Sequence, residues 1–297
     1  MLKARQTHAE TPNPICRQRR LMAQFSLVQQ ESEMNGASAS EKSRSANDDR
    51  ILFRDGASSR KHCPHDVDIS CASCRLNELC LPIALDKNEV DQLNEIVQRN
   101  RPNKKGDHLY RQGDTFKSVY AVRSGSFKSY VLTRNGNRRV TGFFLPGEII
   151  GMDGIASNSY TNSTMALEHS SICEIPFNQL ERLSQQMPAL QHHFFAIMGN
   201  EITRDQDLHT LLSSCTAEQR IVSFLLGLSS RYARVSLSAT RFLLPMTRSD
   251  IGEYLGLTVE TVSRILTALQ RKSFISVNNR EIGLLDLAAL RGIVEAT

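Results

Sequence analysis

The sequence predicts an α+β protein: an N-terminal β jelly-roll barrel, one long helix and a C-terminal winged helix-turn-helix. Three patterns lead to this fold class. Short alternating runs separated by Gly-rich turns fill residues 105–151, a helical period begins at Pro188, and two capped helical patterns precede a hairpin pattern in 247–284. We therefore expect a barrel sensor domain at 85–186, a dimerisation helix at 187–215 and a winged helix-turn-helix domain at 216–297.

The composition limits the class of protein further. The chain has 297 residues, 40% of them hydrophobic, and a net charge of +5, which is compatible with nucleic-acid binding. No apolar run approaches the ~18–20 residues of a membrane helix. The apolar stretch at 21–28 is interrupted by Gln24 and Ser26 and is too short for a secretory signal. We expect a cytoplasmic protein with reduced thiols.

The N-terminal region divides in two. Residues 1–66 are rich in Ser, Asn, Gln, Arg and Asp, so they cannot bury enough apolar surface to offset chain entropy, and we expect a disordered extension. Residues 67–84 form a Cys-rich loop.

In the barrel region, the segments 118–123 and 127–132 have the period of strands, and Ser124-Gly125 forms a turn between them. Regular short strands with Gly-rich turns are typical of an antiparallel barrel or jelly roll, which we expect to continue to Pro176.

The long helix, from Pro188 to about Ser214, carries a seam at spacings of three and four: Phe195, Met198, Ile202, Asp205, His209 and Leu212. In a symmetric dimer Asp205 lies near Asp205 of the second copy, and two carboxylates at close distance repel each other. The seam therefore predicts a weak homodimer that can be switched. The alternative is a helix that packs only on its own barrel.

After Cys215 two further helical patterns are expected. Thr247 then opens a capping box for a helix at 248–255, which Gly256 ends, and Thr258 caps a second helix at 259–272. This spacing predicts a helix-turn-helix. The segments 274–277 and 281–284 flank a polar turn and predict a hairpin wing.

The second helix has residue types that read DNA bases. Glu260, Ser263 and Arg264 share the face opposite an apolar stripe, and Thr258 and Thr261 lie beside them at the helix start. Arg can bind guanine, Glu can accept from cytosine, and the N-terminal half of a recognition helix enters the major groove. A solvated Glu–Arg pair is the alternative.

Three cysteines, Cys71, Cys74 and Cys80, follow a C-x2-C-x5-C pattern that can wrap one metal centre. A zinc site and a cubane iron–sulfur cluster both need four ligands. The spacing leaves these two possibilities open. Cys173 by itself is expected to be a small buried side chain, and no other cysteine lies near Cys16 or Cys215 in the sequence.

Several motifs together resemble the fumarate–nitrate reduction regulator (FNR) branch of the cyclic-AMP receptor protein superfamily. They are the Cys loop, Arg123-Ser-Gly125, Cys173-Glu-Ile-Pro176, G-N-E-I-T-R-D-Q at 199–206 and T-R-S-D-I-G-E-Y-L-G-L-T-V-E-T-V-S-R at 247–264. The resemblance runs from about Cys71 to the C-terminus and does not cover residues 1–66.

The resemblance implies an oxygen-responsive transcription regulator with a [4Fe–4S] cluster held by Cys71, Cys74, Cys80 and Cys173. It implies a homodimer that reads a palindromic TTGAT/ATCAA-type operator through Glu260, Ser263 and Arg264. Ile202 and Asp205 match the dimer-switch positions of the family, and RNA polymerase is an expected partner, although the turn at 135–139 is basic here. A zinc-stapled or cluster-free regulator of the same fold is the alternative.

Two function classes are not expected. Residues 140–181 contain no Lys or Arg that could bind a buried phosphate, so we do not expect a cyclic nucleotide as ligand. The chain also lacks a Gly-rich phosphate loop, a nucleophile elbow and an H-E-x-x-H motif, so we do not expect an enzyme.

Overall fold

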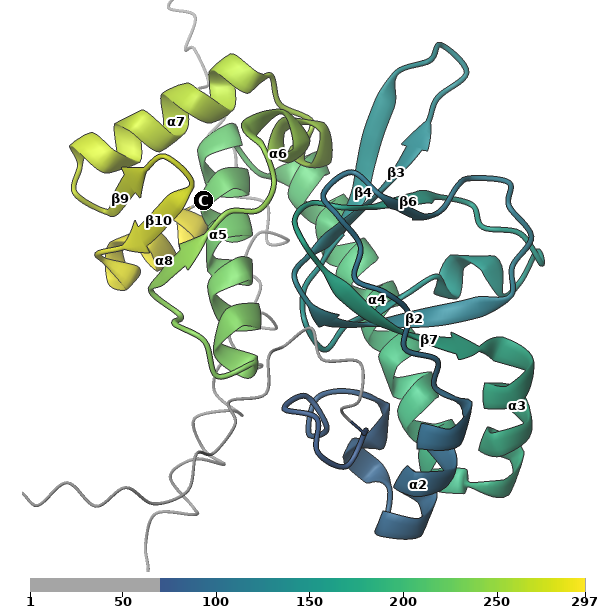
Figure 1. Cartoon of the computed structure of the whole chain (residues 1–297). Helices are drawn as coiled ribbons and strands as arrows, with labels where there is room; N and C mark the ends of the chain where they lie inside the picture. Colours follow the sequence, from purple (N-terminus) through teal and green to yellow (C-terminus); the bar gives the residue numbers. More distant parts are fainter. Residues whose placement is uncertain (1–69, 297) are drawn as a thin grey trace, which may run out of the picture. The chain divides into compact units, whose positions relative to one another are not determined.

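The computed structural model describes residues 70–296 (Figure 1). The expected extension at 1–66 lies outside the described residues, as do Cys16, Cys63 and Thr297. Within 70–296, none of the helices combines the length and apolar character that crossing a membrane requires. The described chain starts with the Cys loop, which leads into the short helix η2 (Leu81–Ala84) and the helix α2 (Lys87–Ile96).

The barrel consists of two antiparallel sheets. Their strand orders are β1-β6-β3-β4 and β5-β2-β7. The strands are β1 (His108–Tyr110), β2 (Ser118–Ser124), β3 (Phe127–Leu132), β4 (Arg138–Phe144), β5 (Ile149–Ile150), β6 (Ser163–Ala166) and β7 (Ser171–Pro176), with the short helix η3 (Met152–Gly154) after β5. Side chains such as Val119, Phe127 and Ile175 are at most 1% exposed and fill the core between the sheets.

The turn between β2 and β3 depends on Gly125. Its φ is +75°, and a Cβ on this residue would lie 2.2 Å from the Oγ of Ser170. Only glycine fits both the left-handed backbone and this close approach. The predicted turn is therefore present, and Gly125 has a steric reason to be there.

Two helices follow the barrel, α3 (Phe177–Gln186) and α4 (Pro188–Ser214). Pro188 is the first residue of α4 and Cys215 is its C-cap, as the sequence predicts. Leu190 and Phe194 bury the first half of α4 in the barrel core.

The C-terminal part is a helix-turn-helix with a wing. It contains α5 (Ala217–Arg234), β8 (Arg241–Leu243), α6 (Arg248–Leu255), α7 (Val259–Arg271), β9 (Ile275–Asn278), β10 (Glu281–Leu284) and α8 (Leu287–Glu295). Thr247 and Asp250 form the predicted capping box, Gly256 ends α6 at φ +66°, and Thr258 caps α7. These features confirm the predicted fold class.

One expectation for this part is wrong. The structure has a single helix, α5, between Cys215 and Thr247, and the second helical pattern is replaced by the strand β8. β8 pairs with β10 of the wing, so that the wing becomes a three-stranded sheet of order β8-β10-β9. Pairing with a distant strand overrides the local pattern.

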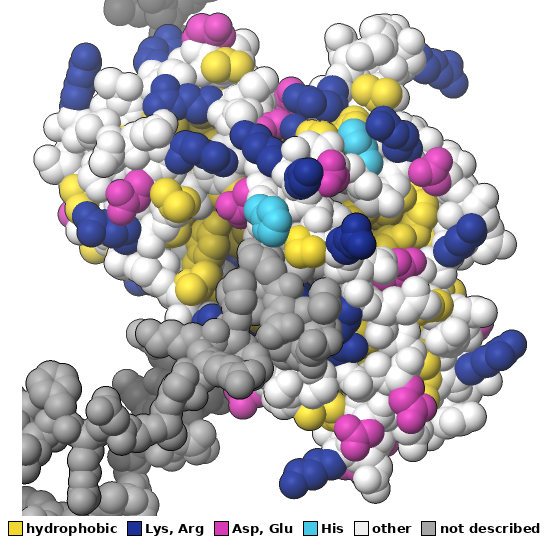
Figure 2. Space-filling model, in the orientation of Figure 1, with side chains coloured by type: hydrophobic (Ala, Val, Ile, Leu, Met, Phe, Trp, Pro, Cys, Tyr) yellow, Lys and Arg dark blue, Asp and Glu magenta, His cyan; other side chains and the backbone are white. Residues whose placement is uncertain are grey.

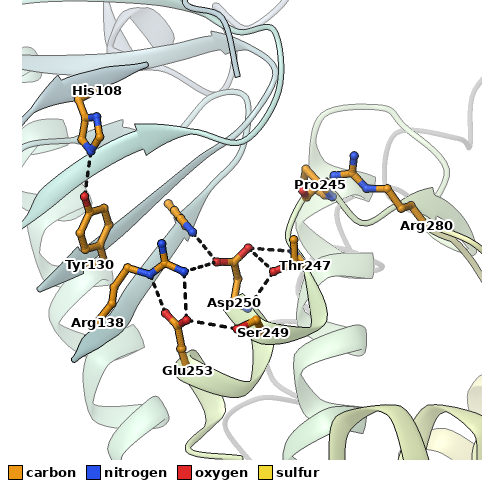
Figure 3. Close-up of polar contacts among 10 residues, drawn as sticks. His108, Tyr130, Arg138, Pro245, Thr247, Ser249, Asp250, Glu253 and Arg280 are labelled. Atoms are coloured by element: carbon orange, nitrogen blue, oxygen red, sulfur yellow. Dashed lines mark hydrogen bonds and ion pairs between the residues drawn. The ribbon is translucent and has the colours of Figure 1, made fainter. Parts of the chain in front are cut away.

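Charged side chains hold α6 against the barrel (Figure 3). Lys128 on β3 donates to the carboxylate of Asp250 on α6, and each side chain is 4% exposed. Arg138 on β4 donates from Nε and Nη2 to the two carboxylate oxygens of Glu253, at 3.0 and 3.1 Å. Apolar side chains from both parts form a shared core beside these contacts.

Candidate metal centre and nucleic-acid interface

The Cys loop is a series of tight turns. The backbone N–H of Cys74 donates to the carbonyl of Cys71 at 3.3 Å, and that of Cys80 donates to the carbonyl of Leu76 at 2.9 Å. Asn94 on α2 anchors the start of the loop, because its Oδ1 accepts from the backbone N–H of Cys71 at 2.9 Å. Cys80 is the N-cap of η2, and Pro82 in the first turn of that helix suits the end of the loop.

Four thiols from two distant segments line one pocket. Cys71, Cys74 and Cys80 come from the loop, and Cys173 comes from the middle of β7, where it pairs with Ala121 of β2. The apolar part of the lining consists of Leu76, Leu81, Pro82, Leu93, Val97, Ala121, Val122 and Ile175. Cys215 is not among the lining residues.

Burial controls the protonation of three thiols of the pocket. It raises the pKa of Cys71 to about 11 and that of Cys80 to about 12. It also raises the pKa of Cys173, although the Arg99 and Arg123 charges act in the opposite direction. These three thiols therefore stay protonated at neutral pH unless a bound metal replaces their protons, as coordination does.

This donor set suits a metal group bound by thiolates. Four thiols surrounded by apolar side chains are the ligands that iron–sulfur clusters and structural zinc share. Within residues 70–296, no three His, Cys, Asp or Glu side chains converge as ligands of one ion. The four thiols thus share a pocket without meeting at a single point.

The loop also contacts α4 and a turn of the barrel. The His193 ring on α4 hydrogen-bonds the backbone of Cys80. Leu79 lies against the turn before β5, since a Cβ on Gly147 would lie 3.4 Å from the Leu79 Cβ. The loop therefore touches both α4 and a barrel turn.

Glu148, the next residue in that turn, connects three elements. It accepts from Arg231 Nε of α5 at 2.8 Å and lies 3.5 Å from Arg204 Nη2 of α4. Burial disfavours its charge, but these two guanidinium groups hold the pKa of Glu148 below its ordinary value. The turn beside the Cys loop is thereby joined to the long helix and to α5.

The expected DNA-reading residues lie at the start of α7. Glu260 and Arg264 are exposed, whereas Ser263 is half-buried and accepts from Arg248 Nη1 at 3.2 Å. The Thr258 hydroxyl lies 3.0 Å from the Thr261 hydroxyl, and it also caps α7. Figure 2 shows Lys and Arg side chains over the region of α6 and α7.

The expected switch residues on α4 differ in environment. Ile202 is 60% exposed and Asp205 is also exposed, but Met198 is half-buried and packs against the barrel core. Phe195, one turn before Met198, is 57% exposed. An exposed apolar stripe thus runs along α4, with Met198 at its edge.

Sequence reasoning missed four residues around the metal pocket. Asn94, Arg99 and His193 contact the Cys loop from α2, the segment after it and α4. No spacing rule marks them, because they reach the loop only through the fold. Arg123 also lines the pocket, and its place in the Arg123-Ser-Gly125 motif is the one signal that could have pointed to it.

Two family models match the chain. Residues 101–187 match the cyclic nucleotide-binding domain, and residues 219–293 match the Crp-like helix-turn-helix domain. Together with the fold, these matches define the class: a transcription regulator with a β-barrel domain of the cyclic nucleotide-binding type and a DNA-binding helix-turn-helix.

Known relatives define the group within that class. The transcriptional activator protein anr of Pseudomonas aeruginosa is 47% identical over 225 residues, which cover 75% of this chain and 92% of the relative. The fumarate and nitrate reduction regulatory protein of Salmonella typhimurium is 44% identical over 227 residues, covering 75% and 91%. The solved structure of FixK2 from Bradyrhizobium japonicum has a TM-score of 0.62 and 29% identity, covering 67% of this chain and 97% of FixK2.

The chain belongs to the FNR/Anr group of the CRP/FNR family of transcription regulators. The predicted family is confirmed, and so is the expectation that the chain is not an enzyme.

Proposed function

We propose that this regulator responds to oxygen through a [4Fe–4S] cluster bound by Cys71, Cys74, Cys80 and Cys173. The observation that carries the proposal is the single apolar pocket in which a loop and a barrel strand bring these four thiols together. A cluster of several metal atoms bridges more widely spaced thiolates than one zinc ion does, which favours it over zinc. When bound, the cluster would supply the oxygen-sensitive chemistry.

The protein's own residues would couple the presence of the cluster to dimer formation. Thiolates that share one bound group tie the loop to β7, and the tied loop presses on α4 through the contact of Cys80 with His193. This contact favours the α4 arrangement in which Ile202 side chains of two copies pack, despite repulsion between Asp205 carboxylates. A coupling of only ~1–3 kcal/mol changes affinity 5- to 150-fold.

We further propose that two copies read a palindromic TTGAT/ATCAA-type operator. Glu260 and Arg264 are exposed at the start of α7, the part of a recognition helix that enters the major groove. Ser263, Thr258 and Thr261 complete the set, and RNA polymerase is the proposed partner at activated promoters. We place this DNA-binding regulator in the cytoplasm. We do not propose a cyclic nucleotide as its ligand, because residues 140–181 contain no Lys or Arg that could bind the phosphate.

Anaerobic purification of the full chain tests the cluster. We expect iron and acid-labile sulfide in equal amounts and visible absorption that fades in air. Zinc without sulfide would instead establish the zinc-stapled alternative and overturn the proposal.

The variant Cys173→Ser tests the fourth ligand. It should lose the visible absorption under anaerobic conditions, because serine does not replace a soft thiolate ligand. Cys215→Ser is the matched control, since Cys215 is not part of the pocket lining, and it should keep the absorption. An unchanged spectrum of Cys173→Ser removes Cys173 from the ligand set.

A further inference from the structure

Two arginines line the metal pocket beside the thiols. Arg99 follows α2, and Arg123 lies on β2, two residues from the Ala121 that pairs with Cys173. Among the ion pairs of residues 70–296, neither guanidinium has a carboxylate partner. Each brings an uncompensated positive charge to the wall of the pocket.

Both arginines also carry unpaired donors. The Nε of Arg99 and the Nη1 of Arg123 are buried without a hydrogen-bond partner in the described part of the chain. Buried N–H groups are nearly always paired in folded proteins. Two unpaired, charged donors on one pocket wall therefore point to an acceptor that occupies the pocket.

The position of Arg99 is fixed by its neighbours. Its Nη2 lies 3.5 Å from the Sγ of Cys71 and also donates to the Oδ1 of Asn94. The same oxygen accepts from the Cys71 backbone N–H. Asn94 thus holds the Arg99 guanidinium next to Cys71.

Arg123 is held in place by the neighbouring strand β7. Its Nε donates to the hydroxyl of Ser171 at 3.4 Å, on the strand that carries Cys173. The charges of Arg99 and Arg123 also lower the pKa of Cys173 against the larger effect of burial. Both guanidinium groups line the same pocket as that thiol.

We propose that Arg99 and Arg123 are positioning residues that hydrogen-bond the sulfurs of the thiolate-bound group and compensate its negative charge. This inference rests on the cluster assignment made above. Hydrogen bonds to sulfur and nearby charge set the reduction potential of such groups. Reduction adds an electron, and so a negative charge, to the bound group. Removing either arginine makes this reduction less favourable, and the reduction potential becomes more negative.

Redox titration of anaerobically purified full-length variants tests this. Arg99→Gln and Arg123→Gln should each have a more negative midpoint potential than the wild type, and the double variant should shift further. Arg99→Lys keeps the charge and should recover part of the shift. Arg101→Gln removes an exposed charge two residues away and should leave the potential unchanged. Glutamine variants that hold full iron and sulfide at the wild-type potential overturn the assignment.

A second measurement does not need the cluster. Metal-free protein is treated with iodoacetamide at one pH, and peptide mass spectrometry gives the rate at Cys71 relative to Cys74. We expect Arg99→Gln to lower this ratio, because the substitution removes the positively charged group whose Nη2 lies 3.5 Å from the Cys71 Sγ. Arg101→Gln should not change it.

The two measurements separate the two proposals. If the wild type takes up no iron or sulfide, the proposed function fails, and the arginine–thiolate contact stands or falls on the labelling ratio alone. An unchanged ratio in Arg99→Gln overturns that contact.

Discussion

Lys128 and Asp250 are 122 residues apart in the sequence, yet their buried side chains form an ion pair between the barrel and the helix-turn-helix. One oxygen of Asp250 accepts from Lys128. The other accepts from the backbone N–H and the hydroxyl of Thr247, at 2.9 and 2.7 Å, and so caps α6. A single carboxylate therefore both starts the first helix of the DNA-binding motif and fastens it to the barrel sheet (Figure 3).

Lys128→Met should be strongly destabilising, because it leaves the Asp250 carboxylate buried without its main counter-ion. We expect a loss of about 3–5 kcal/mol in the free energy of unfolding, measured by chemical denaturation. Adding Asp250→Asn removes the stranded charge while retaining a capping oxygen, so the double variant should recover part of the loss. Arg138→Gln, at a 38% exposed side chain, should cost about 1 kcal/mol or less. Equal losses for Lys128→Met and Arg138→Gln would contradict this account.

The ion pair between Lys128 and Asp250 also predicts how the stability of the fold depends on pH. Burial would raise the pKa of Asp250, but hydrogen bonds from Lys128 and Thr247 outweigh it and hold the pKa below its ordinary value. This depressed pKa contributes stability at pH values above about 4, and the contribution is lost as the pH falls through the folded-state pKa.

In Lys128→Met, burial should prevail and raise the pKa of Asp250. Acidification from pH 7 to about pH 4 then protonates the stranded carboxylate. The stability difference between the wild type and the variant should therefore shrink over this range, as denaturation at several pH values would show. A difference that stays constant would mean that Asp250 does not titrate in this way.

Local chemistry explains how much of the fold could be predicted. Capping boxes, Gly256 at the end of α6 and Pro188 at the start of α4 act within a few residues, so the sequence shows them directly. β8 is different, because the partner that stabilises it, β10, lies about 40 residues further along the chain. Local patterns carry no record of such a pairing.

Some residues of the candidate metal site could likewise be predicted from the sequence, whereas others could not. The three loop cysteines are visible by their spacing, whereas Cys173 by itself predicts only a small buried side chain and required the family resemblance. The structure brings it to the loop because β7 pairs with β2 along the pocket wall. Arg99 reaches Cys71 across 28 positions of the sequence, a contact that only the fold creates.

Asp205 and Ile202 on α4 predict opposite effects on dimer formation. Asp205→Ala removes the proposed carboxylate repulsion, so it should increase the dimer fraction of the protein in air. Ile202→Ser removes a 60% exposed apolar side chain and should weaken the anaerobic dimer. Analytical ultracentrifugation measures both effects, and Glu181→Ala on α3, an exposed acid, serves as the control. A strictly monomeric Asp205→Ala protein in air would count against the switch.

Arg264 should read guanine in the operator half-site. A bidentate arginine–guanine contact gives about 1–3 kcal/mol of discrimination, so Arg264→Ala should bind the TTGAT operator about 5- to 150-fold more weakly. Replacing the guanine should weaken the wild type by a similar factor but hardly affect Arg264→Ala, because the contact is already lost. Fluorescence anisotropy at one fixed salt concentration measures all four combinations. Arg182→Ala on α3 removes an exposed charge outside the helix-turn-helix and should bind normally. If the guanine replacement weakens Arg264→Ala as much as the wild type, Arg264 contacts only the DNA backbone, and another residue reads this base.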